Sequence, residues 1–202
     1  MNYADIYQPT KKTPYWIYNT LLIGSSSFLI ALSAQLHLPI PFSPVPITAQ
    51  TLAVLLIAAF LGKKRALAAV SAYILQGSLG LPVFAGGKSG LAVLMGPTGG
   101  YIWGFAAAAF VVGYLIEIGW DKKVLQAFLA MLLGNGLIYL SGLAWLAEFI
   151  PLEYLLETGF YPFLAGDLTK ILFAVVILST SGKIKDALIS KQGITGSDYR
   201  PN

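Results

Sequence analysis

Two charged residues, Asp167 and Lys170, lie three positions apart inside an otherwise apolar stretch of the sequence. Positions i and i+3 of a helix share one face, so the carboxylate and the ammonium group are expected to lie side by side. A charge at membrane depth is costly, and the few that occur there usually serve a function. The spacing predicts a solute-binding pair, in which Lys170 binds a carboxylate and Asp167 accepts N–H groups or orients the lysine. The alternative is a structural ion pair that holds helices together.

Polar residues in other apolar segments are candidates for the same site. Gln50 begins one segment and Gln76 lies late in the next, so both are expected at the same depth as Asp167. Asn135 and Tyr139 are four positions apart and therefore share one helix face. Each of these four side chains is also consistent with a hydrogen bond between helices, which is a common use of polar residues in membranes.

The composition indicates an integral membrane protein of one domain, spanning residues 1–202. The chain is 56% hydrophobic and only 11% charged, which leaves no room for a soluble catalytic domain. It has no cysteine and one histidine, His37, so disulfides, thiol catalysis and clustered metal ligands are excluded, and no cofactor is expected. The basic residues flank apolar segments rather than form a continuous patch, which favours anchoring at a lipid bilayer over nucleic-acid binding.

Six membrane-spanning helices are predicted, and two of them are short. Their ranges are 16–36, 48–61, 66–81, 98–118, 124–149 and 162–181. A cytoplasmic N-terminus satisfies the positive-inside rule and makes both termini cytoplasmic. The basic residues placed inside are Lys11, Lys12, Lys63, Lys64, Arg65, Lys122, Lys123, Lys183, Lys185, Lys191 and Arg200.

Two segments on the predicted outer side are more apolar than solvated loops. Residues 82–97 are rich in glycine but also apolar, so we expect them to pack onto the protein as a plug or lid. They carry Lys88, the one basic residue in a predicted outer loop, which makes the local field positive and favours a small anionic solute over a cation. Residues 151–159 are expected to form a short amphipathic helix on the surface.

Enzymatic functions find little support in the sequence. Ser78 lacks the glycine context of a nucleophile elbow, and Asp167 has no second carboxylate with which to form a protease dyad. There is no phosphate-binding loop, so active transport would have to draw on ions or on a partner. A rival interpretation is a self-sufficient carrier or channel for a small carboxylate, but the inverted repeats typical of such carriers are not evident.

Four motifs resemble the BioY family, the biotin-binding S components of energy-coupling factor (ECF) vitamin transporters. They are Val-Pro-Ile-Thr-Ala-Gln-Thr-Leu at 45–52, Gly-Leu-Pro-Val-Phe-Ala-Gly-Gly at 80–87, Gly-Pro-Thr-Gly-Gly-Tyr at 96–101 and Gly-Asp-Leu-Thr-Lys at 166–170. The resemblance implies an all-α, six-helix S-component fold in the cell membrane that binds biotin from outside. It also implies a T component and two cytosolic ATP-binding subunits as partners.

The resemblance also assigns roles to particular residues. Asp167 and Lys170 fall on the family's polar binding pair, and Lys88 stands where the family has a basic residue. The first helix of the family usually presents small residues to the T component, and Ser27 and Ala31 are the nearest match here. Biotin suits the predicted site because it combines an anionic valerate, a ureido ring with N–H and carbonyl groups, and an apolar thioether ring. The sequence leaves open which end of biotin faces Asp167.

Overall fold

The computed structural model describes the backbone of residues 14–192 and the side chains up to residue 182, and this part of the chain is mostly helical. The first half contains α2 (Tyr15–Gln35), β1 (His37–Leu38), β2 (Ile47–Thr48), α3 (Gln50–Leu61) and α4 (Lys63–Ser78). The second half contains η1 (Ala85–Gly87), α5 (Leu91–Met95), α6 (Gly99–Leu115), η2 (Ile116–Trp120), α7 (Val124–Leu146), η3 (Leu152–Tyr154), α8 (Leu155–Gly159) and α9 (Tyr161–Gln192).

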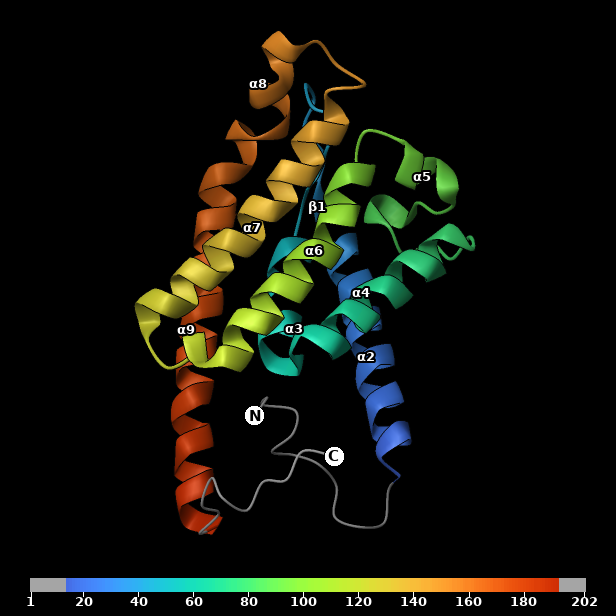
Figure 1. Ribbon diagram of the computed structural model, residues 1–202. Helices are drawn as coiled ribbons and strands as arrows, with labels where there is room; N and C mark the ends of the chain where they lie inside the picture. Colours follow the sequence, from blue (N-terminus) through green and yellow to red (C-terminus); the bar gives the residue numbers. More distant parts are fainter. Residues whose placement is uncertain (1–13, 193–202) are drawn as a thin grey trace.

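The six longer helices run alternately up and down through one bundle (Figure 1). The α3–α4 and α6–α7 turns lie at its lower end, together with the start of α2 and the end of α9. Helices α5 and α8 lie at its upper end, where the short antiparallel pair of β1 and β2 also forms. One continuous core of buried apolar side chains connects the helices.

Helices α6 and α7 approach closely because glycines face the partner helix. A Cβ atom at Gly104 would lie 2.9 Å from the Cα atom of Ile138, and one at Gly142 would lie 2.4 Å from the ring of Tyr101. Only glycine fits such contacts, and small residues at helix interfaces are the usual way to pack helices in membranes. The close packing brings aromatic residues of both helices to a shared central cavity.

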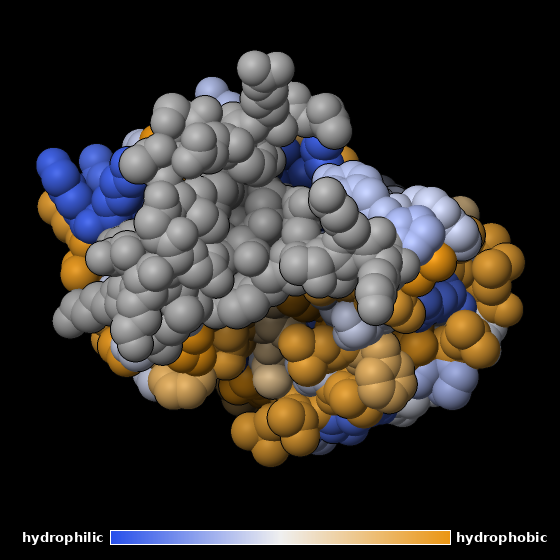
Figure 2. Space-filling view, turned by 90° about the horizontal axis from the view of Figure 1, so that it is seen from below, coloured by the Kyte–Doolittle hydropathy of each residue, from blue (hydrophilic) through white to orange (hydrophobic). Residues whose placement is uncertain are grey.

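The outer surface of the bundle is suited to lipid. Within the described residues, four stretches are long and apolar enough to cross a membrane, namely Tyr15–Gln35, Gly99–Trp120, Val124–Leu146 and Leu152–Gly182. Large apolar side chains such as Phe28, Leu172 and Phe173 are more than half exposed, which water would disfavour. Figure 2 views the lower end and shows apolar side chains over much of the visible surface beside separate hydrophilic patches. The chain is a multi-pass membrane protein.

Each predicted span corresponds to a helix, although several boundaries differ. The helices α3 and α4 are short, with 12 and 16 residues, as the sequence indicates. Helix α4 begins at Lys63 rather than at residue 66, because Gly62 adopts a positive φ of 77° and a new helix starts directly after it. The carboxylate of Glu117 accepts the backbone N–H of Lys63 at 3.0 Å and pairs with its ammonium group at 3.4 Å. Helix α9 continues beyond residue 181 to Gln192.

The two predicted outer segments are both structured. Residues 82–97 contain η1 and α5 and are anchored by Phe84 and Leu94, whose side chains are almost fully buried. Residues 151–159 form η3 and α8, with Leu152 and Leu156 exposed, so a short helical segment lies on the surface there. The predicted packing of the first segment is therefore correct, whereas its movement as a lid stays a prediction.

Candidate functional site

A cavity that is partly open to the surroundings lies in the upper half of the bundle. Helices α3, α6, α7 and α9 form its walls, together with residues around β2 and the turn that carries Lys88. Much of its lining is aromatic, from the rings of Phe84, Tyr101, Phe105, Tyr139 and Phe163. A few polar groups among apolar walls are the usual lining of a site for a small molecule.

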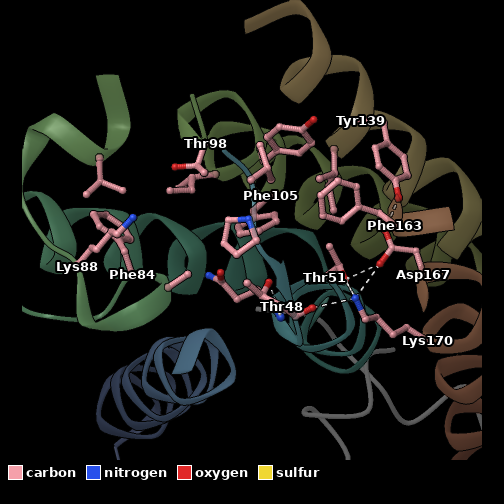
Figure 3. A pocket seen from close by; sticks show the side chains of 18 residues that line it. Thr48, Thr51, Phe84, Lys88, Thr98, Phe105, Tyr139, Phe163, Asp167 and Lys170 are labelled. Atoms are coloured by element: carbon pink, nitrogen blue, oxygen red, sulfur yellow. Dashed lines mark hydrogen bonds and ion pairs between the residues drawn. The ribbon is translucent and has the colours of Figure 1, made fainter. Parts of the chain in front are cut away.

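Charged groups lie at the two opposite ends of this cavity (Figure 3). Asp167 and Lys170 of α9 form one end, with Tyr139 of α7 and Thr51 of α3 beside them. Lys88 lies at the other end, close to Phe84. The cavity is therefore elongated, with polar groups at both ends and an apolar middle.

The carboxylate of Asp167 is buried and accepts hydrogen bonds from four side chains. Its Oδ1 atom accepts from Lys170 Nζ at 2.8 Å and from Thr51 Oγ1 at 3.3 Å. Its Oδ2 atom accepts from the hydroxyl of Tyr139 at 2.5 Å and from Asn135 Nδ2 at 3.4 Å. A carboxylate offers about four acceptor positions, so the surrounding residues satisfy this one. The bonds from Thr51 and Asn135 are the longest and weakest of the four.

The ammonium group of Lys170 also has a complete set of partners. Besides Asp167, it donates to the backbone carbonyl of Thr48 at 2.8 Å and to Thr51 Oγ1 at 3.2 Å. Thr48 is held in place by the pairing of β2 with β1, in which it faces His37. The opposite charges of Asp167 and Lys170 make this end of the cavity electrically neutral, and three acceptors match the three N–H donors of Lys170.

Lys88 lies at the other end of the cavity, in surroundings that differ from those of Lys170. Its side chain is exposed, and within residues 14–182 it has neither a salt bridge nor a side-chain hydrogen bond. It follows the tight turn of Phe84 to Gly87, in which the carbonyl of Phe84 accepts the backbone N–H of Gly87 at 3.1 Å. The ring of Phe84 fills a notch over Gly77 of α4, where a Cβ atom would lie 2.1 Å from it. The positive charge of Lys88 is thus available to an anion.

The structure brings most of the predicted site residues together. Asp167, Lys170, Lys88, Gln50 and Tyr139 line the cavity. Gln50 donates to the hydroxyl of Tyr73 at 2.6 Å, so its amide is partly occupied by the protein. Asn135 lies behind the cavity wall and contacts Asp167, and its Oδ1 atom has no hydrogen-bond partner among the described residues.

The structure places three predicted residues elsewhere. Gln76 accepts a hydrogen bond from Ser27 Oγ at 3.2 Å and joins α4 to α2, outside the cavity, so it is a contact between helices. Ser27 is fully buried and Ala31 is 7% exposed. In this structure, therefore, neither of these two small residues is accessible to a partner. The face of α2 that is exposed carries Leu21, Phe28 and Leu32 instead.

The sequence interpretation did not single out several residues that line the cavity. Thr48 of β2 and Thr51 in the first turn of α3 contact Lys170. Phe84, Phe105 and Phe163 supply apolar wall. The motif at residues 45–52 includes both threonines, so it held a signal for them. The motif at residues 80–87 likewise includes Phe84. Phe163 lies in none of the four motifs, and phenylalanine occurs in five of the six predicted apolar segments, so its residue type alone gave no signal.

Comparisons with known proteins identify the family. The sequence model of the BioY family matches residues 9–187. The chain is 40% identical to the biotin transporter BioY of Thermotoga maritima over 158 residues, which cover 77% of this chain and 92% of that protein. It is 36% identical to the biotin transporter BioY2 of Lactococcus lactis over 165 residues, covering 79% and 87%.

A solved structure agrees with these relatives. The fold matches a crystal structure of the S-component for biotin from an ECF-type ABC transporter with a TM-score of 0.75 and 27% sequence identity. The match covers 83% of this chain and 92% of that one. The resemblance carried by the four sequence motifs is therefore confirmed over most of the chain, and the protein belongs to the BioY family.

Proposed function

We propose that this protein is the biotin-binding S component of an ECF transporter and is a transport subunit rather than an enzyme. The observation that carries the proposal is the elongated cavity, with a hydrogen-bonding pair at one end, a free cation at the other and aromatic walls between them. Biotin has the matching order of groups, a ureido ring at one end, an anionic carboxylate at the other and apolar atoms between. The relatives named as biotin transporters and the biotin S-component support the same ligand.

The charges favour one orientation of biotin in the cavity. The Asp167–Lys170 pair is neutral as a unit, whereas Lys88 carries an uncompensated positive charge at the opposite end. The carboxylate of biotin therefore binds Lys88, and the ureido ring meets the pair, with an N–H donated to Asp167 and the carbonyl accepting from Lys170. The hydroxyl of Thr51 makes the longest hydrogen bond of Lys170, at 3.2 Å, and the longer of the two hydrogen bonds to Asp167 Oδ1, at 3.3 Å. Because long hydrogen bonds are weak, the ureido group replaces these two.

Direct binding tests this function. Purified protein in detergent is expected to bind radiolabelled biotin at a ratio of one to one, and excess unlabelled biotin should displace it. Thiamine and riboflavin are suitable controls, because both are vitamins without a carboxylate and without a cyclic urea of this size. Equal binding of all three vitamins, or no binding of biotin, would contradict the proposal.

The proposed assembly contains a T component and two cytosolic ATP-binding subunits. Support comes from the solved S-component, which is part of an ECF-type ABC transporter, and from the lack of a phosphate-binding loop in this sequence. Liposomes that contain this chain alone are expected to bind biotin without accumulating it. Accumulation without ATP-binding subunits would favour the alternative of a self-sufficient carrier.

The proposed topology has six membrane crossings within one domain and cytoplasmic termini. It is supported by Lys63, Lys64, Lys122 and Lys123, which all lie at the lower end of the bundle, opposite α5 and α8. The chain lacks cysteine, so single cysteines can be introduced and labelled cleanly. We expect Ser89→Cys and Glu157→Cys to react with an impermeant thiol reagent in intact cells. Lys64→Cys and Lys122→Cys should react only after permeabilisation, and the reverse pattern would overturn the orientation.

A further inference from the structure

The turn that carries Lys88 is held by the side chain of Gln35, the last residue of α2. Gln35 Nε2 donates to the carbonyl of Phe84 at 3.3 Å, and Gln35 Oε1 accepts the backbone N–H of Gly87 at 3.1 Å. The same nitrogen also donates to the carbonyl of Ala31 at 3.2 Å, which fixes the amide against the last turn of its own helix. One side chain thus bridges both ends of the turn.

The backbone conformation of this turn favours glycine, and the turn is tied to two helices. Gly86 and Gly87 both adopt positive φ angles, of 71° and 69°, which residues with a side chain rarely tolerate. Two consecutive glycines make the unconstrained chain flexible, so ordering the turn carries an entropic cost. The turn is tied to α2 by Gln35, and beyond Lys88 the backbone N–H of Gly90 donates to the carbonyl of Gly77 in α4 at 2.7 Å. Lys88 is therefore held between anchors on two helices.

We propose that Gln35 is a positioning residue that keeps Lys88 directed at the ligand carboxylate and so slows ligand release. The inference rests on the proposed function, because it takes biotin as the ligand whose carboxylate Lys88 binds. Gln35 does not line the cavity and acts through the turn alone. An exposed, long lysine side chain loses much conformational freedom on binding an anion, and a fixed backbone lowers that cost.

The test measures the dissociation rate of radiolabelled biotin from the full-length protein. Gln35→Met keeps the length and packing of the side chain but removes its hydrogen bonds. It is expected to raise the dissociation rate by about two- to three-fold, which is less than the effect of removing Lys88 itself. Gln126→Met is the matched control, because Gln126 lies in the first turn of α7, away from the cavity. The dissociation rate of biotin from this variant should equal that from the unmodified protein. Gln35→Asn is a second variant whose amide is too short to span both peptide groups, so a similar increase is expected.

A double variant separates a positioning role from a general structural one. If Gln35 acts through Lys88, adding Gln35→Met to Lys88→Ala will leave the dissociation rate of Lys88→Ala nearly unchanged. The same fold-increase in both backgrounds would overturn the proposal, and so would an unchanged rate in the single variants.

Hydrogen exchange keeps this test separate from the test of biotin binding. Without ligand, exchange of the backbone amides in residues 84–90 should be faster in Gln35→Met than in the unmodified protein. Unmodified protein that failed to bind biotin would overturn the proposed function, whereas unchanged exchange in this segment would overturn the role of Gln35.

Discussion

At one end of the cavity, Asp167 and Lys170 are held by side chains and backbone of α3, α7, α9 and β2, whereas at the other end Lys88 follows a turn that contains two glycines. The side chains of Asp167 and Lys170 are 7% and 19% exposed and have full sets of hydrogen-bond partners. Lys88 is exposed and lacks such partners within the described side chains. One end is thus organised without a ligand, whereas we expect the other to complete its contacts when an anion binds.

This difference separates two tasks that a binding subunit must perform. A preorganised polar end gives selectivity, because a ligand lacking the right donors and acceptors leaves buried groups unpaired. A charge on a turn attracts the anion, and we expect its contribution to binding to depend on how firmly the turn is held. Substitutions at the first end are expected to change both binding and folding, and those at the second end should change binding alone.

The largest effect is expected for Asp167→Ala. The change removes the common acceptor of four side chains and leaves the Lys170 ammonium group without its counter-charge. Biotin affinity should fall about ten-fold or more, as expected for the loss of a charged hydrogen bond. The melting temperature should fall as well. Binding assays and thermal unfolding in detergent measure the two effects, with the exposed Glu153→Ala as the control. Normal affinity in a destabilised variant would show that the pair is purely structural.

A smaller effect confined to binding is expected for Lys88→Ala. The side chain is exposed, so its removal should leave the melting temperature unchanged while the dissociation rate of biotin rises by about three- to ten-fold. Added salt should weaken biotin binding to the unmodified protein more than to this variant, because the salt screens the contact with Lys88. Lys122→Ala, an exposed lysine at the opposite end of the bundle, serves as the control. A lower melting temperature for Lys88→Ala would remove the distinction between the two ends.

The sequence indicated the charged residues of both ends for different reasons. Asp167 and Lys170 could be predicted because helical spacing is local, so an interval of three residues already places them side by side. Lys88 stood out because it was the one basic residue in a predicted outer loop. The helices themselves could be predicted from apolar length, apart from the early start of α4 and the extension of α9.

The sequence could not indicate how each helix is rotated about its own axis. Gln50 and Gln76 lie at similar depths in neighbouring helices, yet one faces the cavity and the other faces Ser27 of α2. In a soluble protein, the polar face of a helix indicates which side faces the solvent and therefore how the helix is rotated. A membrane helix is apolar on the side that faces lipid as well as on the side that faces the protein, so this indication is lost. Contacts such as the one from Gln35 to the Lys88 turn depend on tertiary structure, and no spacing rule links residues about fifty positions apart.

The smallest effect is expected for Thr51→Val, although Thr51 contacts both members of the charged pair. Its hydroxyl donates to Asp167 at 3.3 Å and accepts from Lys170 at 3.2 Å, whereas Lys170 keeps bonds of 2.8 Å to Asp167 and to Thr48 without it. If the ureido group of biotin replaces these two weak bonds, the hydroxyl contributes to the empty site but not to the occupied one. Valine has nearly the same shape, so biotin affinity should change by less than about three-fold. The melting temperature without ligand should fall slightly, and saturating biotin should restore it to the value of the unmodified protein with biotin. Calorimetry with and without biotin measures both quantities. A loss of affinity as large as that of Asp167→Ala would mean that Thr51 binds the ligand itself, and that the ureido group does not displace it.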